Sequence, residues 1–194
     1  MTEREKMIAG LMYSVQDEEL IRLHRACVDA CVLCDRILPS RLEERREHLR
    51  RILGRTGKNF LIEPGFRCDY GFNMSIGENF FANYDLVVLD CAPVRFGRNC
   101  FLGPQCGFYT AVHPLDAETR AAGLEYARPI TVGDDVWFGG HVTVLPGVTI
   151  GDRSVIGAGS VVTHDIPSGV VAAGNPCRVI RPVDQASCSA EGID

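Results

Sequence analysis

The sequence has little that would carry it into or across a membrane, and it has no excess of basic residues. The longest stretches free of Asp, Glu, Lys and Arg, Asn99–Leu115 and Val136–Gly151, are broken by glycine, proline and histidine, so no membrane span is expected. The formal net charge of −5 argues against a nucleic-acid partner. Residues Met1–Lys6 show no basic start followed by an apolar core, which predicts no signal peptide and a cytoplasmic location.

The composition is that of a folded chain. Apolar residues make up 46% of the 194 residues, enough to bury a core, and charged residues make up 23%, too few for a disordered chain. The length predicts one domain, with room for a small appendage.

Nine cysteines without a secretory signal indicate free thiols in a reducing compartment. Cys27, Cys31 and Cys34 fall on one face of a predicted helix. This spacing fits either a metal site or a buried stripe of small apolar side chains. The sequence favours the stripe, because no fourth ligand lies nearby.

Residues 1–57 have the apolar spacing of helices, with intervals of three and four along one face. Asp17 is expected to cap the first long helix. Pro39 interrupts the pattern, and Ser40 and Glu43 match a capping box for a second helix. Gly54 is a natural stop. The segment therefore predicts a short helical hairpin.

Beyond Gly57 the helical spacing disappears, and a six-residue repeat becomes visible. From Val132 the chain divides into such units without a gap, each beginning with an apolar residue, usually followed by glycine. A period of six suits a short strand plus a tight turn, with three units closing one triangular coil and stacked coils pairing along their backbones. The residues expected to fill the interior are Val132, Phe138, Val144, Ile150, Ile156 and Val162.

A fainter set of the same units begins at Ile76, Phe96 and Leu102. Ile76 is out of phase with the others by two residues, so a bulge or loop is expected between Phe80 and Phe96. Residues Ala111–Pro129 break the pattern for 19 positions, with His113 near their start. A long structureless excursion from a compact repeat is typically functional, and we expect that here.

The helical start, the repeats and several local segments resemble the maltose and galactoside O-acetyltransferases, a branch of the hexapeptide-repeat acyltransferases. The likeness runs from about Glu5 to Arg181 and is carried by segments beginning at Phe66, Asn79, Val136 and Asn175. It implies a mainly β fold, a left-handed parallel β-helix, over residues 58–183, after a helical segment at 1–57 and before a tail at 184–194. It also implies a homotrimer with active sites between subunits.

The same resemblance implies the reaction and its residues. Acetyl-CoA is the expected donor, no metal is required, and a small sugar of the maltose, glucose or galactoside type is the expected acceptor. His113 matches the general base, a role that suits histidine, and Gly140 matches an oxyanion donor. The remaining matches are Trp137, Gly140, Ala158, Thr163, His164, Arg178 and Arg181 toward the cofactor, and Asp69, Asn83 and Asp90 toward the acceptor.

Two positions depart from the family pattern. His164 stands where the family usually has lysine, which weakens one expected cofactor contact. Cys91 stands where some relatives have an acidic acceptor contact, which leaves the acceptor open.

Three alternatives remain at this point. One is acetyl transfer to a non-sugar acceptor. Another is a zinc carbonic anhydrase on the same coil, which needs three histidines, and His113 and His141 are available. The last is a solenoid that only binds a partner, which would leave the excursion with His113 unexplained.

Overall fold

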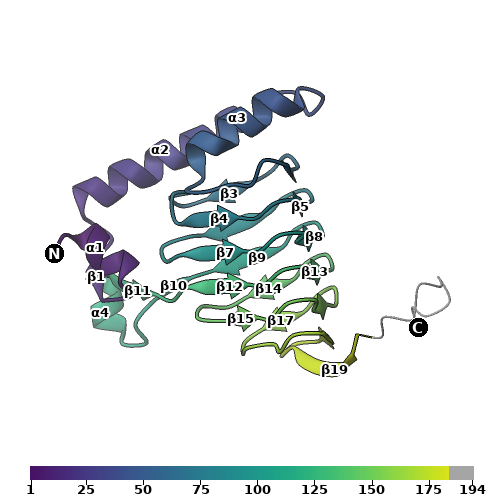
Figure 1. Cartoon of the computed structure of the whole chain (residues 1–194). Coiled ribbons are helices and arrows are strands. Elements are labelled where there is room, and N and C mark those ends of the chain that lie inside the picture. The colour runs from purple at the N-terminus through teal and green to yellow at the C-terminus, as the bar shows by residue number, and fades with distance from the viewer. Residues whose placement is uncertain (184–194) are drawn as a thin grey trace.

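A computed structural model describes residues 1–183, and the predicted tail at 184–194 lies outside the described residues. Two long helices lie across one end of a stack of short strands, and the chain descends coil by coil from that end (Figure 1). The helices are α1 (Glu3–Ile8), α2 (Glu18–Asp35), α3 (Leu42–Ile52) and α4 (Ala117–Ala121). None of the helices in this part of the chain is both long and apolar enough to cross a bilayer.

The strands of the stack form three faces. The four-stranded face contains β4 (Met74–Ile76), β7 (Val94–Phe96), β12 (Ile130–Val132) and β15 (Thr149–Ile150). The five-stranded face contains β3 (Arg67–Cys68), β6 (Val87–Leu89), β9 (Gly107–Tyr109), β14 (Thr143–Val144) and β17 (Val161–Val162). The seven-stranded face contains β2 (Phe60–Ile62), β5 (Phe80–Ala82), β8 (Phe101–Leu102), β13 (Trp137–Phe138), β16 (Val155–Ile156), β18 (Val170–Ala173) and β19 (Arg178–Pro182).

Within the coils every pairing is parallel, and only the last strand, β19, runs antiparallel to its neighbour β18. The first positions of the six-residue units are all buried, as expected. Phe80, Phe96, Phe108 and Phe138 form a column inside the coils, with edge-to-face contacts at centroid distances of 5.1, 4.8 and 5.3 Å. The predicted parallel β-helix of hexapeptide repeats is therefore confirmed.

The break in phase has a defined place. In the early coils Ile76 pairs with Phe96, twenty positions on, whereas later Val132 pairs with Ile150, eighteen positions on. The extra residues lie at the corner between the five-stranded and four-stranded faces, at 69–73 and again at 90–93. We refer to these two segments as the widened corners. The second lies within the predicted interval between Phe80 and Phe96.

The long excursion leaves the stack at the same corner, and the expectation that it is structureless is wrong. It contains β10 (Ala111–Val112), α4 and β11 (Leu124–Ala127). β11 pairs antiparallel with β10 and also with β1 (Tyr13–Ser14) from the start of the chain. These strands satisfy each other's backbone groups, so the excursion is an ordered arm beside α1 (Figure 1).

The two predicted helix caps have different outcomes. The Asp17 side chain accepts the Leu20 N–H at 3.0 Å, which confirms it as the cap of α2. The capping box at Ser40 is wrong, because α3 begins only at Leu42 and has no side-chain cap.

Buried Arg45 accounts for this late start. Its guanidinium donates to the carbonyls of Cys34 and Ile37 at the end of α2 and of Ile62 in β2. A cation beside carbonyls at the C-terminal end of α2 stabilises that end and ties α3 to it, and the Cys34 carbonyl also accepts the Ile37 N–H at 3.1 Å.

The three cysteines of the α2 stripe are buried, as both interpretations of their spacing require. The stripe faces the first coil, where the Sγ of Cys68 in β3 lies 3.4 Å from the Sγ of Cys27. All eight cysteines among residues 1–183 are free thiols.

Candidate active site

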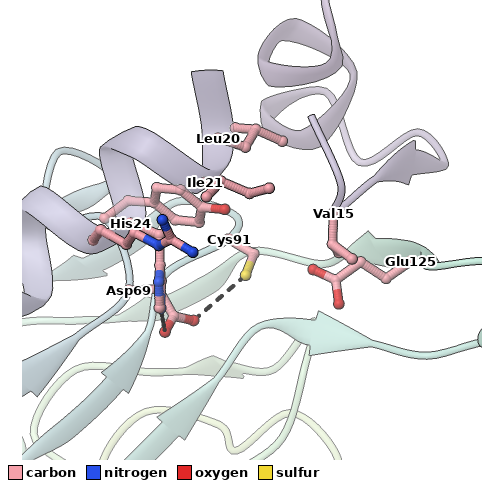
Figure 2. A pocket seen from close by; sticks show the side chains of 9 residues that line it. Val15, Leu20, Ile21, His24, Asp69, Cys91 and Glu125 are labelled. Atoms are coloured by element: carbon pink, nitrogen blue, oxygen red, sulfur yellow. Dashed lines mark hydrogen bonds and ion pairs between the residues drawn. The ribbon is translucent and has the colours of Figure 1, made fainter. Parts of the chain in front are cut away.

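A cavity of about 390 Å3 lies where α2, the widened corners and the arm meet. Figure 2 shows side chains reaching it from each of these elements. Its apolar wall comes from Val15, Leu20 and Ile21, and its polar groups include His24, Asp69 and Glu125.

His113 stands beside this cavity because of the pairing in the arm. Ala111 pairs with Ala127 and Val112 with Tyr126, so the next pair along the two strands is His113 and Glu125. The His113 Nδ1 lies 3.5 Å from the Glu125 Oε2, and the other carboxylate oxygen of Glu125 accepts a hydrogen bond from the Tyr13 hydroxyl. Glu125 is buried, whereas 61% of the His113 side chain is exposed. The imidazole is thus held at one nitrogen and open at the other.

Asp69 forms a second histidine–carboxylate pair on the opposite wall. His24 Nε2 of α2 lies 3.3 Å from Asp69 Oδ1, and the Cys91 thiol donates to Asp69 Oδ2 at 3.6 Å. Burial raises the pKa of Asp69, and the neighbouring His24 opposes this shift. Burial likewise raises the pKa of the Cys91 thiol, which favours its role as a donor to the carboxylate.

Asp90 is not on the cavity wall. It is fully buried, and its carboxylate accepts the backbone N–H groups of Tyr70 at 2.8 Å and Asn73 at 3.3 Å. Its oxygens are engaged in tying one widened corner to the other. The expectation that Asp90 contacts an acceptor directly is therefore not supported by its position, and we assign it to holding the Asp69 segment in place.

Asn83 lies at a different corner, just after β5. Its backbone N–H donates to Leu102 O at 3.0 Å, and its side-chain oxygen accepts the N–H of Tyr84 at 2.8 Å. It does not line the cavity that contains Asp69. One chain therefore does not bring the two predicted acceptor residues together.

The residues expected to meet the cofactor follow the seven-stranded face and its edge. Trp137 projects outward from β13, in register with Phe101 of β8, and is 54% exposed. The following glycines allow close stacking, because a Cβ at Gly139 would lie 2.6 Å from the nitrogen of Ala158. Gly140 O accepts the Gly159 N–H at 2.9 Å, while its own N–H has no hydrogen-bond partner within residues 1–183.

The other cofactor candidates lie toward the last coil. The Thr163 hydroxyl and the His164 Nδ1 are 2.8 Å apart. His164 and Arg178 line one cavity of about 240 Å3, and Arg181 follows on the same exposed strand, β19. This brings His164 and Arg178 together, although they come from different segments.

Sequence reasoning missed three residues of the site: Tyr13, His24 and Glu125. His24 lies on α2 and pairs with Asp69 across the cavity. A signal for Glu125 was present, since a hairpin closed across the excursion places it opposite His113. Nothing in the sequence indicated that Tyr13 pairs with β11.

Comparison with known proteins matches these features to one group. The family model described as bacterial transferase hexapeptide (six repeats) matches residues 129–164, and the maltose acetyltransferase hexapeptide capping motif matches residues 6–57. A protein of Saccharomyces cerevisiae named as an acetyltransferase is 47% identical over 182 residues, covering 93% of each chain.

Solved structures that are similar to this chain include members of the same family. A maltose O-acetyltransferase from Clostridium difficile 630 superposes with a TM-score of 0.93 at 48% identity, covering 95% of this chain and 99% of that one. A galactoside acetyltransferase in complex with coenzyme A gives a TM-score of 0.90 at 40% identity, covering 95% and 92%. A hexapeptide-repeat acetyltransferase of Vibrio cholerae, complexed with acetyl coenzyme A, gives 0.87 at 36% identity, covering 95% and 100%.

The fold and the site thus define a hexapeptide-repeat acetyltransferase. Within that class the chain belongs to the family of the maltose and galactoside O-acetyltransferases, as its capping motif and its structural neighbours show.

The buried Asp90 generates a prediction about stability. Burial raises the pKa of Asp90 to about 7, whereas an unfolded Asp titrates near 3.9. Between about pH 4 and pH 7 the native state therefore holds the extra proton, and this group's contribution to the free energy of unfolding falls as pH rises, by at most about 1.4 kcal/mol per pH unit.

Denaturant unfolding of wild type and Asp90→Asn across this range measures the effect. We expect the stability advantage of wild type over Asp90→Asn to shrink from pH 4 to pH 7. The exposed Asp29→Asn is the control and should show no such trend. A pH-independent difference for Asp90→Asn would contradict the assignment.

Proposed function

We propose that this chain transfers the acetyl group of acetyl-CoA to a hydroxyl of a small sugar, with His113 as general base. The observation that carries the proposal is the pairing of His113 with buried Glu125, beside a cavity whose opposite wall presents Asp69. The similar proteins described above are acetyltransferases, which favours acetyl transfer over the zinc carbonic anhydrase alternative.

The histidine–glutamate pair sets the direction of proton transfer. Because Glu125 faces Nδ1, the proton rests on that nitrogen and Nε2 is free to accept the proton of an acceptor hydroxyl. The carboxylate stabilises the imidazolium that forms, and Tyr13 fixes the carboxylate through its second oxygen. His113 then returns the proton to the departing thiolate. Acetyl-CoA supplies the acetyl thioester, and the unpaired Gly140 N–H is the proposed donor to its carbonyl oxygen as negative charge develops.

His113 is tested with a thiol-release assay using acetyl-CoA and a mixed set of sugars. His113→Ala should lower kcat by about a hundredfold or more, with acetyl-CoA binding nearly intact. Glu125→Gln should lower kcat less, because His113 remains but the imidazolium that forms loses its carboxylate partner. His48→Ala is the control, because the His48 ring is hydrogen-bonded to the carbonyl of Ala30, between α3 and α2 and away from the cavity. Normal turnover by His113→Ala would exclude the role.

The acceptor proposal rests on the chemistry of the cavity. A sugar presents hydroxyls, which need fixed polar partners, and Asp69 is held by His24 and Cys91. The apolar wall of Val15, Leu20 and Ile21 suits an acceptor with one less polar face, such as a glycoside. Asn83 lies at another corner, so in our proposal it reaches the acceptor from a neighbouring subunit.

Loss of the Asp69 contact should raise the KM for the sugar and lower kcat/KM by roughly ten- to a hundredfold in Asp69→Ala, the range for one hydrogen bond to a charged group. Asn83→Ala should act in the same direction. The KM for acetyl-CoA should barely change. A panel of mono- and disaccharides that gives no thiol release, while an amine acceptor does, would exclude the sugar in favour of the non-sugar alternative.

The donor proposal places acetyl-CoA along the edge from Trp137 past Ala158 toward Thr163 and His164. It is supported by the common cavity of His164 and Arg178 and by the coenzyme A bound in the galactoside acetyltransferase structure. Arginine is a strong phosphate partner, so Arg178 and Arg181 are the proposed phosphate contacts.

Arg178→Ala and Arg181→Ala should weaken acetyl-CoA affinity, and the loss should be smaller at high salt because exposed charges are screened. Titration calorimetry at two salt concentrations measures both effects. Arg98→Ala, which loses only a surface pair with Asp134, is the control. Unchanged acetyl-CoA affinity in both variants would contradict the assignment of β19 to the cofactor site.

A homotrimer is part of the proposal. Phe101 and Trp137 stand side by side on the outer seven-stranded face and are about half exposed, which is costly for large aromatic side chains unless they meet a ligand or another subunit. Light scattering should give three times the chain mass, and a mass of one chain at working concentration would contradict it. The cytoplasmic location stays a prediction.

A further inference from the structure

Three cysteine sulfurs converge between helix α2 and the first coil of the stack. Cys27 and Cys31 are one turn apart on α2 and face the same way, and Cys68 of β3 lies opposite them. The Sγ of Cys68 is 3.4 Å from that of Cys27 and 3.8 Å from that of Cys31, and all three lie within 4.8 Å of one another. All three residues are buried. Cys34, the third member of the sequence stripe, is not part of this group.

We propose that Cys27, Cys31 and Cys68 bind a thiophilic metal ion in trigonal sulfur coordination, with Cu(I) as the ion of this class. A metal–sulfur distance of about 2.3 Å places sulfurs about 4.0 Å apart around a trigonal ion. The two edges at Cys68 are 3.4 and 3.8 Å and the third is within 4.8 Å, so small side-chain shifts bring the three sulfurs to this spacing.

The number of ligands favours a trigonal ion over a tetrahedral one. Soft thiolates select Cu(I), Zn(II) or iron–sulfur clusters. Structural Zn(II) takes four protein ligands. Within residues 1–183 no further His, Cys, Asp or Glu joins the three sulfurs. Three thiolates complete the coordination of Cu(I), and leave Zn(II) one ligand short.

A cavity borders the cluster on one side. Cys27 lines this cavity of about 230 Å3 with Leu23, Ala30 and Tyr70, between α2 and the first widened corner. Of the three cysteines, Cys27 is the one that lines it. On binding, each thiol releases its proton to solvent and its sulfur donates a lone pair to the ion, whose oxidation state does not change. The charged neighbours that act on the cluster are Arg67, toward Cys31, and Asp90, toward Cys27 and Cys68.

The experiment uses the full reduced chain with Cys188→Ser as background, since Cys188 lies outside the described residues. Tetrakis(acetonitrile)copper(I) is added anaerobically in competition with bathocuproine disulfonate, and copper X-ray absorption counts the sulfur neighbours. We expect one Cu(I) per chain with three sulfur ligands. Cys68→Ser should reduce the sulfur count to two and weaken binding by at least about tenfold, the lower end of what loss of even an outer partner costs a metal site.

Cys34→Ser is the matched control on the same helix, and it should bind as the background protein does. Cys27→Ser, at the cavity wall, gives a second test if Cys68→Ser does not fold, which circular dichroism reports. A sulfur count below three in the background protein, equal binding by Cys27→Ser, or displacement of Cu(I) by equimolar Zn(II) would overturn the proposal. None of these measurements involves acetyl transfer, so the outcome is independent of the proposed function.

Discussion

The backbone pairing between successive coils is the interaction on which the rest of the structure depends. Each strand has only a few residues, and its N–H and C=O groups are satisfied by the coils above and below. Once register is set, the strands cannot take an insertion without flipping or unpairing side chains, so extra residues can enter only at corners. One corner receives both widened segments and the ordered arm, and this is where the cavity forms. The candidate site therefore lies at the corner where the chain departs from the six-residue repeat.

At this corner the buried groups hold other residues in place, and the partly exposed groups are open to a ligand. Asp90 and Glu125 are removed from solvent and hold other groups, the first through two backbone N–H donors and the second through His113 and Tyr13. His113 and Asp69 are left partly open, with one side fixed by a partner. A buried carboxylate that is fully engaged positions its neighbours at low mobility, whereas an accessible one can exchange its partner for a ligand.

The repeat made the fold readable from sequence, because interior positions recur every six residues and a phase error of two residues reveals an insertion. The contacts across elements were not readable. The pairing of His24 with Asp69, and of Cys68 with the α2 cysteines, depends on where α2 lies on the first coil, which no local pattern encodes. Asp90 was expected near the acceptor from the resemblance alone, and its hydrogen bonds to the N–H groups of Tyr70 and Asn73 join two corners that lie about twenty residues apart, which no local pattern encodes. Ser40 and Glu43 have the residue types of a capping box, but Ser40 lies two residues before the start of α3. The contact of buried Arg45 with the Cys34 carbonyl joins α2 to α3 across this turn, and the local pattern does not reveal it.

A stack of coils has two open ends, and each would offer unpaired strand edges to another molecule. Helices α2 and α3 cover the first end (Figure 1). At the other end β19 turns back antiparallel on β18, exposed along its length and carrying Arg178, Arg181 and Pro182. A further parallel coil cannot continue this reversed strand in the same register, and charge and proline discourage edge pairing. The β18–β19 hairpin thus ends the stack of coils. It disfavours the end-to-end joining of one solenoid to another, and so the growth of fibres.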